Sequence, residues 1–386
     1  MSSDLKSNLN TLPPEERVIF ALRALYERYD YRPYRMSEFE EYSLYAENRS
    51  FLQSPRVIAF TDLDGRMMAL KPDVTLSIVR HAQAVPCTAE KLYYTENVFR
   101  PSAASQTFKE ISQIGVEAIG LIDRYQTAEI VALSAMSLEA ISPDYLIEIS
   151  HMRFTVGLLT ALGISGDART RALSALSAKN MSELRQAAAQ ACLAPADTAT
   201  LLQLPTLYGE VEPTLCKARA LCRSEEMHEA LDELCAVLGA AGSCAADGKL
   251  QLDFSIAGDT DYYNGLMLRG YISGLPRAVL LGGRYDNILH KLGKSGGGIG
   301  FAIDLSEIAR LPGERPKADT DLLILYRESD DLASLMASVA KAAKKGLRVR
   351  ALPENQQIEA SPNARRVYLS DLTDEEFPAE GGGDVC

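Results

Sequence analysis

Apolar residues near the start of the chain recur three or four positions apart, a spacing that brings them to one side of a helix. The positions follow Pro13 and Pro14 and are Val18, Leu22, Leu25 and Tyr29. Glu15 and Glu16 come directly after the two prolines, and this order is typical of a helix start. The pattern therefore predicts a first helix that ends near Asp30.

Short runs of strand-forming residues follow this helix. Residues 57–61 and 66–70 flank the turn Asp62-Leu63-Asp64-Gly65, which predicts a β-hairpin. A longer pair of runs, at 91–100 and 110–119, is joined by a polar segment at 101–109. Together these segments predict an antiparallel sheet.

The run at 111–119 places two polar side chains on one face of its strand. Side chains alternate between the faces of a strand, so Gln113 and Glu117 share a face with Gly115 between them, while the residues at 114, 116 and 118 are apolar and point the other way. Two interpretations stay open at this point. The polar face is either the floor of a ligand site or a sheet face turned to solvent.

Residues 152–242 are rich in alanine and leucine at helical spacing, which predicts a helical insertion. Strands are expected again at 250–256, 262–272 and 278–281. The glycines at 296–298 and 300 lack the spacing of a nucleotide-binding fingerprint, so a tight turn against the sheet is favoured over a phosphate loop.

The last part of the chain has the pattern of a small α/β unit, with strands at 321–326, 347–351 and 366–369 and a helix at 329–344. We therefore expect a main body at 1–151 and 243–312, the helical insertion at 152–242, and the small unit at 319–372. An acidic tail at 373–386 is expected to be disordered.

Composition narrows the class of protein further. A net charge of -12 and a pI near 5.0 argue against a broad surface for nucleic-acid phosphates. No run approaches the ~20 apolar residues of a membrane span, so a soluble cytoplasmic protein is expected. The seven cysteines contain no C-x-x-C pair, and the four histidines show no metal spacing. We expect neither a metal nor a cofactor.

Several short motifs occur in an order that resembles the histidyl-tRNA synthetases, a class II aminoacyl-tRNA synthetase family. They are Leu70-Lys71-Pro72-Asp73-Val74-Thr75, Phe99-Arg100, Gln113-Ile114-Gly115-Val116-Glu117, Asp261-Tyr262-Tyr263 and Gly282-Gly283-Arg284-Tyr285-Asp286. The resemblance implies an α+β fold, with a class II synthetase-like antiparallel sheet flanked by helices, a helical insertion and a truncated α/β C-terminal unit.

The same resemblance implies a pocket for histidine. Asp73 and Thr75 match residues that bind the amino group, and Arg100 is expected to pair with the ligand carboxylate. The remaining expected pocket residues are Gln113 and Glu117, together with Tyr263 and Tyr285 at the imidazole end.

The residues that activate the amino acid are replaced. Gly258 stands where the family carries a catalytic arginine, Glu307 stands at the position of the ATP-binding arginine, and the loop after Arg100 lacks the His-Glu-Arg-Pro run. At ~4 Å and an effective dielectric near 20, one pair of charges is worth about 4 kcal/mol of attraction or repulsion. We therefore expect no catalytic residues, unless Arg269, Arg277 or Arg284 supplies a compensating cation.

This combination resembles the regulatory subunits of ATP phosphoribosyltransferase, inactive paralogs of the synthetase. The resemblance implies a short-form catalytic subunit as partner, a homodimer within a hetero-octamer, feedback inhibition by histidine, and no binding of tRNA or membrane. Two alternatives stay open, namely an active histidine-tRNA ligase or other adenylate-forming ligase, and an amino-acid-binding paralog that serves another enzyme.

Overall fold

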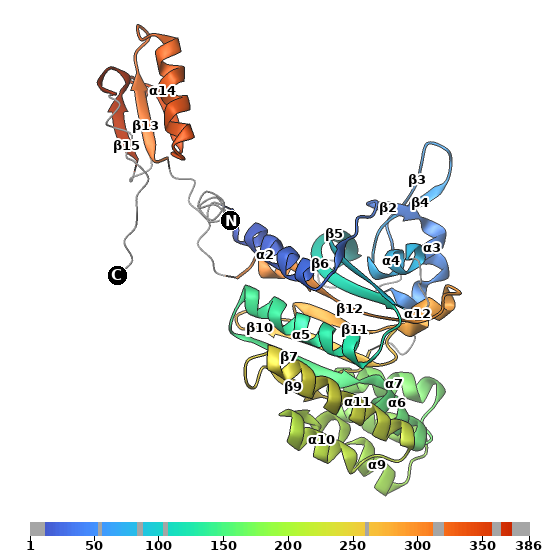
Figure 1. Cartoon of the computed structure of the whole chain (residues 1–386). Helices are drawn as coiled ribbons and strands as arrows, with labels where there is room; N and C mark the ends of the chain where they lie inside the picture. Colours follow the sequence, from blue (N-terminus) through green and yellow to red (C-terminus); the bar gives the residue numbers. More distant parts are fainter. Residues whose placement is uncertain are drawn as a thin grey trace. The chain divides into compact units, whose positions relative to one another are not determined.

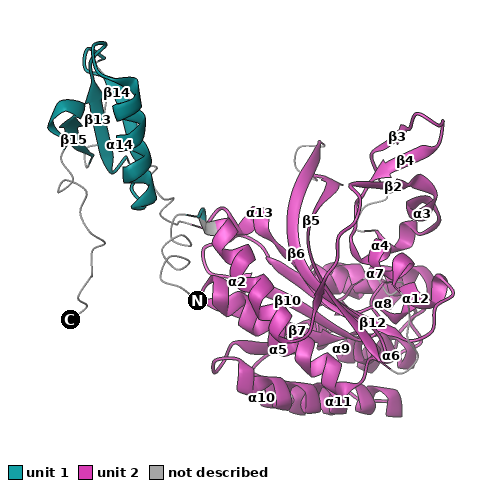
Figure 2. Cartoon of the chain, turned by 45° about the horizontal axis from the view of Figure 1, so that its top comes forward, with its two compact units in different colours: residues 1–13, 313–386 teal, residues 14–312 magenta. Residues whose placement is uncertain are grey.

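The computed structural model describes residues 12–52, 56–82, 88–102, 107–258, 262–311, 320–356 and 364–372 (Figure 1). The chain divides into two compact units, a larger one of Pro14–Pro312 (magenta in Figure 2) and a smaller one of Met1–Pro13 with Gly313–Cys386 (teal). The expected acidic tail at 373–386, residues 312–319 and most of the loop after Arg100 lie outside the described residues.

A large sheet forms the centre of the larger unit. The described strands follow the order β1 (Arg32–Pro33), β5 (Ala89–Pro101), β6 (Phe108–Gly120), β12 (Gly297–Asp304), β11 (Leu280–Arg284), β10 (Leu266–Ile272), β7 (Tyr145–His151), β9 (Leu250–Asp253) and β8 (Tyr208–Gly209). The strands from β5 to β7 are antiparallel, and only the pairs β1–β5 and β7–β9 are parallel. The predicted antiparallel sheet is confirmed.

Two long helices, α2 (Pro14–Arg28) and α5 (Arg124–Ile141), pack on one face of this sheet and against each other (Figure 1). The first helix is confirmed and ends two residues before the expected position. Helix α5 begins with a capping box, in which the Asp123 carboxylate accepts from the backbone of Gln126 and the Gln126 side chain accepts from the backbone of Asp123. Tyr26 and Leu133 are fully buried on this side.

The opposite face carries a second hydrophobic core. Adjacent residues Tyr93 and Tyr94 point to opposite faces, and Tyr94 joins this second core. The covering elements are a small sheet of β2 (Phe39–Glu41), β4 (Met67–Leu70) and β3 (Ala59–Thr61), the helices α3 (Tyr42–Glu47), α4 (Thr75–His81) and α12 (Asp286–Lys291), and the short helix η1 (Arg49–Phe51). The predicted hairpin is confirmed, with Gly65 at φ 79° in its turn.

Helices make up most of residues 152–241, as predicted, and the two-residue strand β8 lies among them. They are α6 (Met152–Ala161), α7 (Gly166–Ser177), α8 (Met181–Gln190), α9 (Pro195–Leu201), α10 (Val211–Arg219) and α11 (Glu225–Ala241), with short turns η2 (Leu204–Thr206) and η3 (Gly242–Cys244). These helices share one core with the sheet, since the rings of Phe154 on α6 and Phe254 lie 4.6 Å apart and α11 packs on α5. Their definition as a separate insertion remains a prediction.

The C-terminal unit has its own small core. Strand β13 (Leu322–Tyr326) lies between β14 (Val349–Pro353) and β15 (Arg365–Tyr368), all parallel, with α14 (Leu332–Lys344) packed beside them and η4 (Leu369–Asp371) at the end. The core consists of Leu322, Ile324, Leu335, Ala342 and Val367. The three strands and the helix predicted here are confirmed, within a few residues at each end.

Candidate functional site

A pocket of about 270 Å³ opens on the face of the large sheet that faces α4 and α12. Each of the seven residues expected to form a histidine site lines this pocket. They are Asp73, Thr75, Arg100, Gln113, Glu117, Tyr263 and Tyr285. The structure therefore gathers residues that lie up to about 210 positions apart in the sequence, while their binding of histidine remains a prediction.

The floor of the pocket is formed by β6 and β12. Gln113 and Glu117 point to the same side of β6, as strand alternation predicts, and both line the pocket. Gly300 on β12 pairs in register with Glu117, and a Cβ atom at this glycine would collide with the Glu117 carboxylate. The Glu117 carboxylate can therefore occupy this buried position only because Gly300 has no side chain.

Glu117 sits at the inner end of the pocket and is only 2% exposed. Its carboxylate accepts hydrogen bonds from Thr75 at 2.6 Å and from Tyr285 at 2.5 Å. Burial raises the pKa of Glu117 to about 8, although these two hydrogen bonds oppose the shift. Near neutral pH this buried carboxyl is therefore close to its ionisation point, and the protonated form is favoured below about pH 8.

Asp73 and Arg100 form the charged side of the pocket. Arg100 Nη2 lies 3.3 Å from Asp73 Oδ2, and Arg100 Nε donates to the carbonyl oxygen of Pro72 at 2.6 Å. Burial raises the pKa of Asp73, and the positive charge of Arg100 opposes that shift. Arg100, the expected partner of a ligand carboxylate, is thus already paired with an acid of this chain.

Aromatic rings make up much of the remaining wall. The rings of Tyr262 and Tyr263 lie 4.5 Å apart, and Tyr262 lies 6.1 Å from Tyr285. Tyr94 was not among the residues expected from the sequence, yet it lines the pocket and pairs in register with Gly115. Tyr94 could have been predicted from the sequence. Pairing of the runs at 91–100 and 110–119, combined with the alternation of side chains along each strand, indicates which residues of β5 share a face with Gln113 and Glu117.

Gly258 does not line this pocket. It borders a separate hollow against α7, beside Ala257. A Cβ atom at Gly258 would lie 2.8 Å from Met267 Cε and 2.9 Å from Tyr263 Cδ2, closer than ordinary packing allows. The neighbours have therefore closed around the position that carries an arginine in the synthetases.

Glu307, at the start of α13 (Leu305–Ile308), is 7% exposed and does not line the pocket either. Two arginines face it, with Arg310 Nη1 at 2.9 Å and Arg277 Nε at 3.8 Å. The negative charge expected here is therefore balanced locally. Of the three arginines considered as compensating cations, Arg277 lines the pocket, whereas Arg269 and Arg284 do not.

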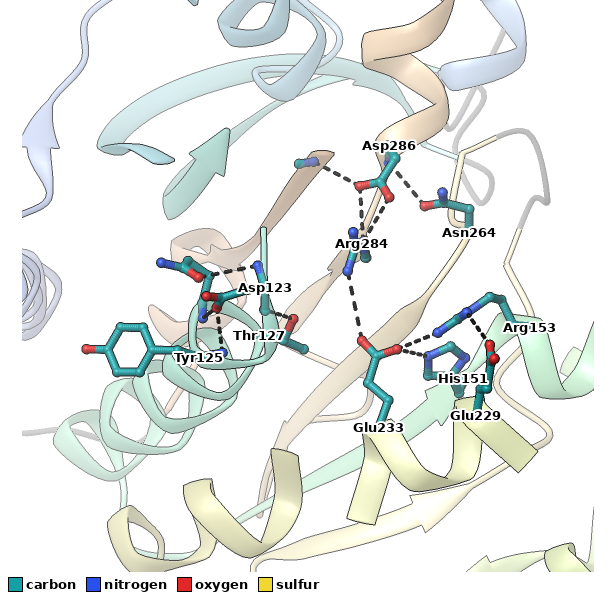
Figure 3. A network of polar contacts seen from close by, with 12 residues as sticks. Asp123, Tyr125, Thr127, His151, Arg153, Glu229, Glu233, Asn264, Arg284 and Asp286 are labelled. Atoms are coloured by element: carbon teal, nitrogen blue, oxygen red, sulfur yellow. Dashed lines mark hydrogen bonds and ion pairs between the residues drawn. The ribbon is translucent and has the colours of Figure 1, made fainter. Parts of the chain in front are cut away.

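A network of ion pairs joins the pocket strands to helix α11 (Figure 3). The Glu233 carboxylate on α11 lies 2.5 Å from Arg153, 3.4 Å from His151 and 3.9 Å from Arg284. Arg284 also pairs with Asp286 at 2.8 Å. Since Tyr285 lies between Arg284 and Asp286, this network fixes the backbone that carries a pocket residue.

The Asp286 carboxylate extends this network to the pocket floor. It accepts from the backbone N–H of Gly298 on β12 at 3.0 Å, and the Asp286 backbone N–H donates to Asn264 at 3.0 Å (Figure 3). The motif Gly282-Gly283-Arg284-Tyr285-Asp286 thus has a structural explanation in this chain. Tyr285 lines the pocket, and the charged residues on either side of it hold its backbone in place.

Neither a metal-binding cluster nor a membrane-spanning helix occurs among the described residues. No group of three or more His, Cys, Asp or Glu side chains in the described ranges is arranged to hold a metal ion. Of the helices that the structure describes, none has both the length and the apolarity needed to cross a bilayer.

Comparison with known proteins places these features in a family. The model of the histidyl-tRNA synthetase family matches residues 12–308. The ATP phosphoribosyltransferase regulatory subunit of Moorella thermoacetica is 30% identical, over 88% of this chain and 89% of that protein. Both matches cover most of the chain.

Two solved structures share the fold. One is an ATP phosphoribosyltransferase regulatory subunit/histidyl-tRNA synthetase from Bacillus halodurans, with a TM-score of 0.77 and 23% identity over 93% of this chain and 95% of that one. The other is a chain of the ATP phosphoribosyl transferase (HisG:HisZ) complex from Thermotoga maritima, with a TM-score of 0.58 and 16% identity over 75% and 97%. The predicted class II synthetase-like fold is confirmed. The chain belongs to the histidyl-tRNA synthetase family and, within it, to the regulatory subunits of ATP phosphoribosyltransferase.

Proposed function

We propose that this chain is the non-catalytic partner that a short-form catalytic subunit requires to join ATP and phosphoribosyl pyrophosphate, the first step of histidine biosynthesis. The related protein from Moorella thermoacetica is a regulatory subunit of this enzyme, and the Thermotoga maritima complex contains a chain with this fold. In this proposal the protein acts in the cytoplasm, as a homodimer within a hetero-octamer.

The observation that carries the proposal is the contrast between the two sides of the synthetase-like site. The amino-acid side keeps a polar pocket with Glu117, Thr75 and Tyr285 hydrogen-bonded at its inner end. On the other side, Gly258 stands at the position of the catalytic arginine and supplies no charge, and its neighbours Met267 and Tyr263 pack closely against it. Adenylate formation needs several cations around a triphosphate, so the site suits binding without that reaction.

Histidine is the proposed ligand of the pocket, and its binding is the proposed signal for feedback inhibition. A ligand changes a quaternary equilibrium only to the extent that it binds one state more tightly than the other. The amino group is expected near Asp73 and the imidazole near Glu117 and Tyr285, which are both almost fully buried. A ring that contacts Glu117 would displace the hydrogen bond from Tyr285 and thereby alter the strand that the ion-pair network holds.

The test is an assay of the purified chain with and without a short-form catalytic subunit. We expect formation of phosphoribosyl-ATP only in the mixture, inhibition of that activity by histidine, and no histidine-dependent exchange of pyrophosphate into ATP by this chain alone. Pyrophosphate exchange would favour an active histidine-tRNA ligase instead. Failure to activate any short-form catalytic subunit would contradict the proposal.

A further inference from the structure

The pocket extends along the strands that form its floor. Glu117 pairs in register with Gly300, and Gln113 pairs with Asp304, four residues further along both strands. With a rise of about 3.3 Å per residue, the two levels are about 13 Å apart. The pocket therefore has an inner level at Glu117 and an outer level at Gln113 and Asp304, and all three side chains line it.

Arg277 lies at the outer level. It precedes β11 by a few residues, and the nearby carbonyl oxygen of Val279 accepts from the backbone N–H of Asp304 at 2.8 Å. Among the described residues that line the pocket, Arg100 and Arg277 are the two with permanent positive charge. They differ in how firmly this chain already holds them.

Arg100 is held on two sides. Its side chain is 13% exposed, and it makes the contacts with Pro72 and Asp73 given above, which fix its orientation and offset its charge. A ligand carboxylate that approached Arg100 would also approach the Asp73 carboxylate. The attraction of Arg100 for an anion is therefore reduced by its own partner.

Arg277 is held more loosely. Its side chain is 69% exposed, and its distance of 3.8 Å to Glu307 is too long for a hydrogen bond. Glu307 has a closer partner in Arg310, at 2.9 Å. Movement of Arg277 toward the pocket would therefore leave Glu307 paired with a cation, so this movement carries little electrostatic cost.

A bound amino acid supplies a reason for that movement. With its ring at the inner level and its amino group near Asp73, its carboxylate points toward the outer level, where the Asp304 carboxylate also lines the pocket. The ligand carboxylate and the Asp304 carboxylate would repel each other, and a cation between them would offset that repulsion. We propose that Arg277 leaves Glu307 and binds the carboxylate of the amino acid, so that Glu307 serves as the resting position of this arginine.

This inference rests on the proposed function, because it assumes that the pocket binds histidine. Its test compares two ligands by calorimetry on the full chain, namely histidine and histidinol, which has an alcohol in place of the carboxylate. We expect Arg277→Ala to weaken the binding of histidine about tenfold or more, the effect of one lost charged hydrogen bond. Binding of histidinol should change less than twofold, and Arg277→Lys should recover part of the loss.

Arg310→Ala is a second variant, since Arg310 also pairs with Glu307 but does not line the pocket. Without Arg310, the movement of Arg277 would take both of these arginines away from Glu307. We therefore expect Arg310→Ala to weaken the binding of histidine, by a smaller factor than Arg277→Ala does, and to leave the binding of histidinol unchanged. Equal weakening of both ligands in Arg277→Ala, or no change in histidine affinity, would overturn the role of Arg277 and leave the proposed function intact. A parent chain that binds no histidine would refute the histidine pocket itself, and this inference with it.

Discussion

The ionisation of Glu117 makes the stability of the fold depend on pH. Its usual pKa is near 4.5 and burial raises it to about 8, so the folded chain keeps a proton that the unfolded chain releases between these values. The unfolding free energy contributed by this group therefore falls as the pH rises from about 4.5 to 8. We expect Glu117→Gln to gain stability relative to the parent, by on the order of 2 kcal/mol between pH 5 and pH 8. Urea denaturation at both pH values measures this difference, and parallel pH profiles would contradict it.

Gly258 allows a second prediction about a single position. Because a Cβ atom there would press on Met267 and Tyr263, we expect Gly258→Ala to destabilise the fold by about 1–3 kcal/mol, and Gly258→Arg to restore no pyrophosphate exchange. Gly239→Ala in α11 is the control, since it adds the same methyl group in open space on a helix. That variant should be neutral or up to about 1 kcal/mol more stable. Thermal unfolding of Gly258→Ala and Gly239→Ala measures the two changes in stability.

Part of the site could be predicted from single residues. Strand alternation alone assigned Gln113 and Glu117 to one face, and the structure places both in the pocket. The pairing of Arg277 with Glu307 could not be predicted, because it depends on how the turn before β11 folds over α13. The contact between Arg100 and Asp73 was missed for the same reason, since alternation says which face a side chain occupies but not which neighbour it meets.

Helix α11 contributes its own charge to the large sheet, through Glu233. Burial opposes ionisation of this group, yet His151, Arg153 and Arg284 outweigh that effect and lower the pKa of Glu233 to about 2. Stability from Glu233 is therefore present above its usual pKa near 4.5 and is lost as the pH falls toward 2. Burial lowers the pKa of His151 as well, so protonation of the unfolded chain below about pH 6.5 destabilises the fold further.

We expect Glu233→Gln to lower the unfolding free energy by about 2–4 kcal/mol at pH 7, because it leaves two arginines near the pocket strands without their shared acid. Asp232→Asn is the control on the same helix, since Asp232 is 56% exposed and pairs with Arg219 at the surface. That change should cost less than about 1 kcal/mol. Urea denaturation distinguishes the two, and equal losses would show that Glu233 has no special role.

Among the helices and strands, the confirmed predictions are those that depend on the local sequence pattern. The hairpin at 57–70 and the helices between 152 and 241 follow from turn residues and apolar spacing, and both are confirmed. Strand β8 was not predicted. It is two residues long and exists because Tyr208 and Gly209 meet β9, so its cause is tertiary rather than local.

For the whole molecule, the two units have separate hydrophobic cores, which predicts independent folding. We expect a fragment of residues 1–312 to keep cooperative thermal unfolding and to bind histidine within about threefold of the full chain, since the described pocket residues all belong to the larger unit. Circular dichroism and calorimetry on the fragment test both points. Loss of cooperative unfolding would mean that the small unit completes the fold of the larger one.

Two glycines of β12 lie directly against side chains of the pocket, so substitutions at these glycines should have a recognisable phenotype. A methyl group at Gly298 would strike the ring of Tyr285, and one at Gly300 would strike Glu117. Under the proposed function, a shift of Glu117 or Tyr285 that makes room for such a methyl group would disturb the contacts expected with histidine. Bacteria that carry these alleles would then continue to make histidine when it is plentiful, and would be recognised by growth on toxic histidine analogues.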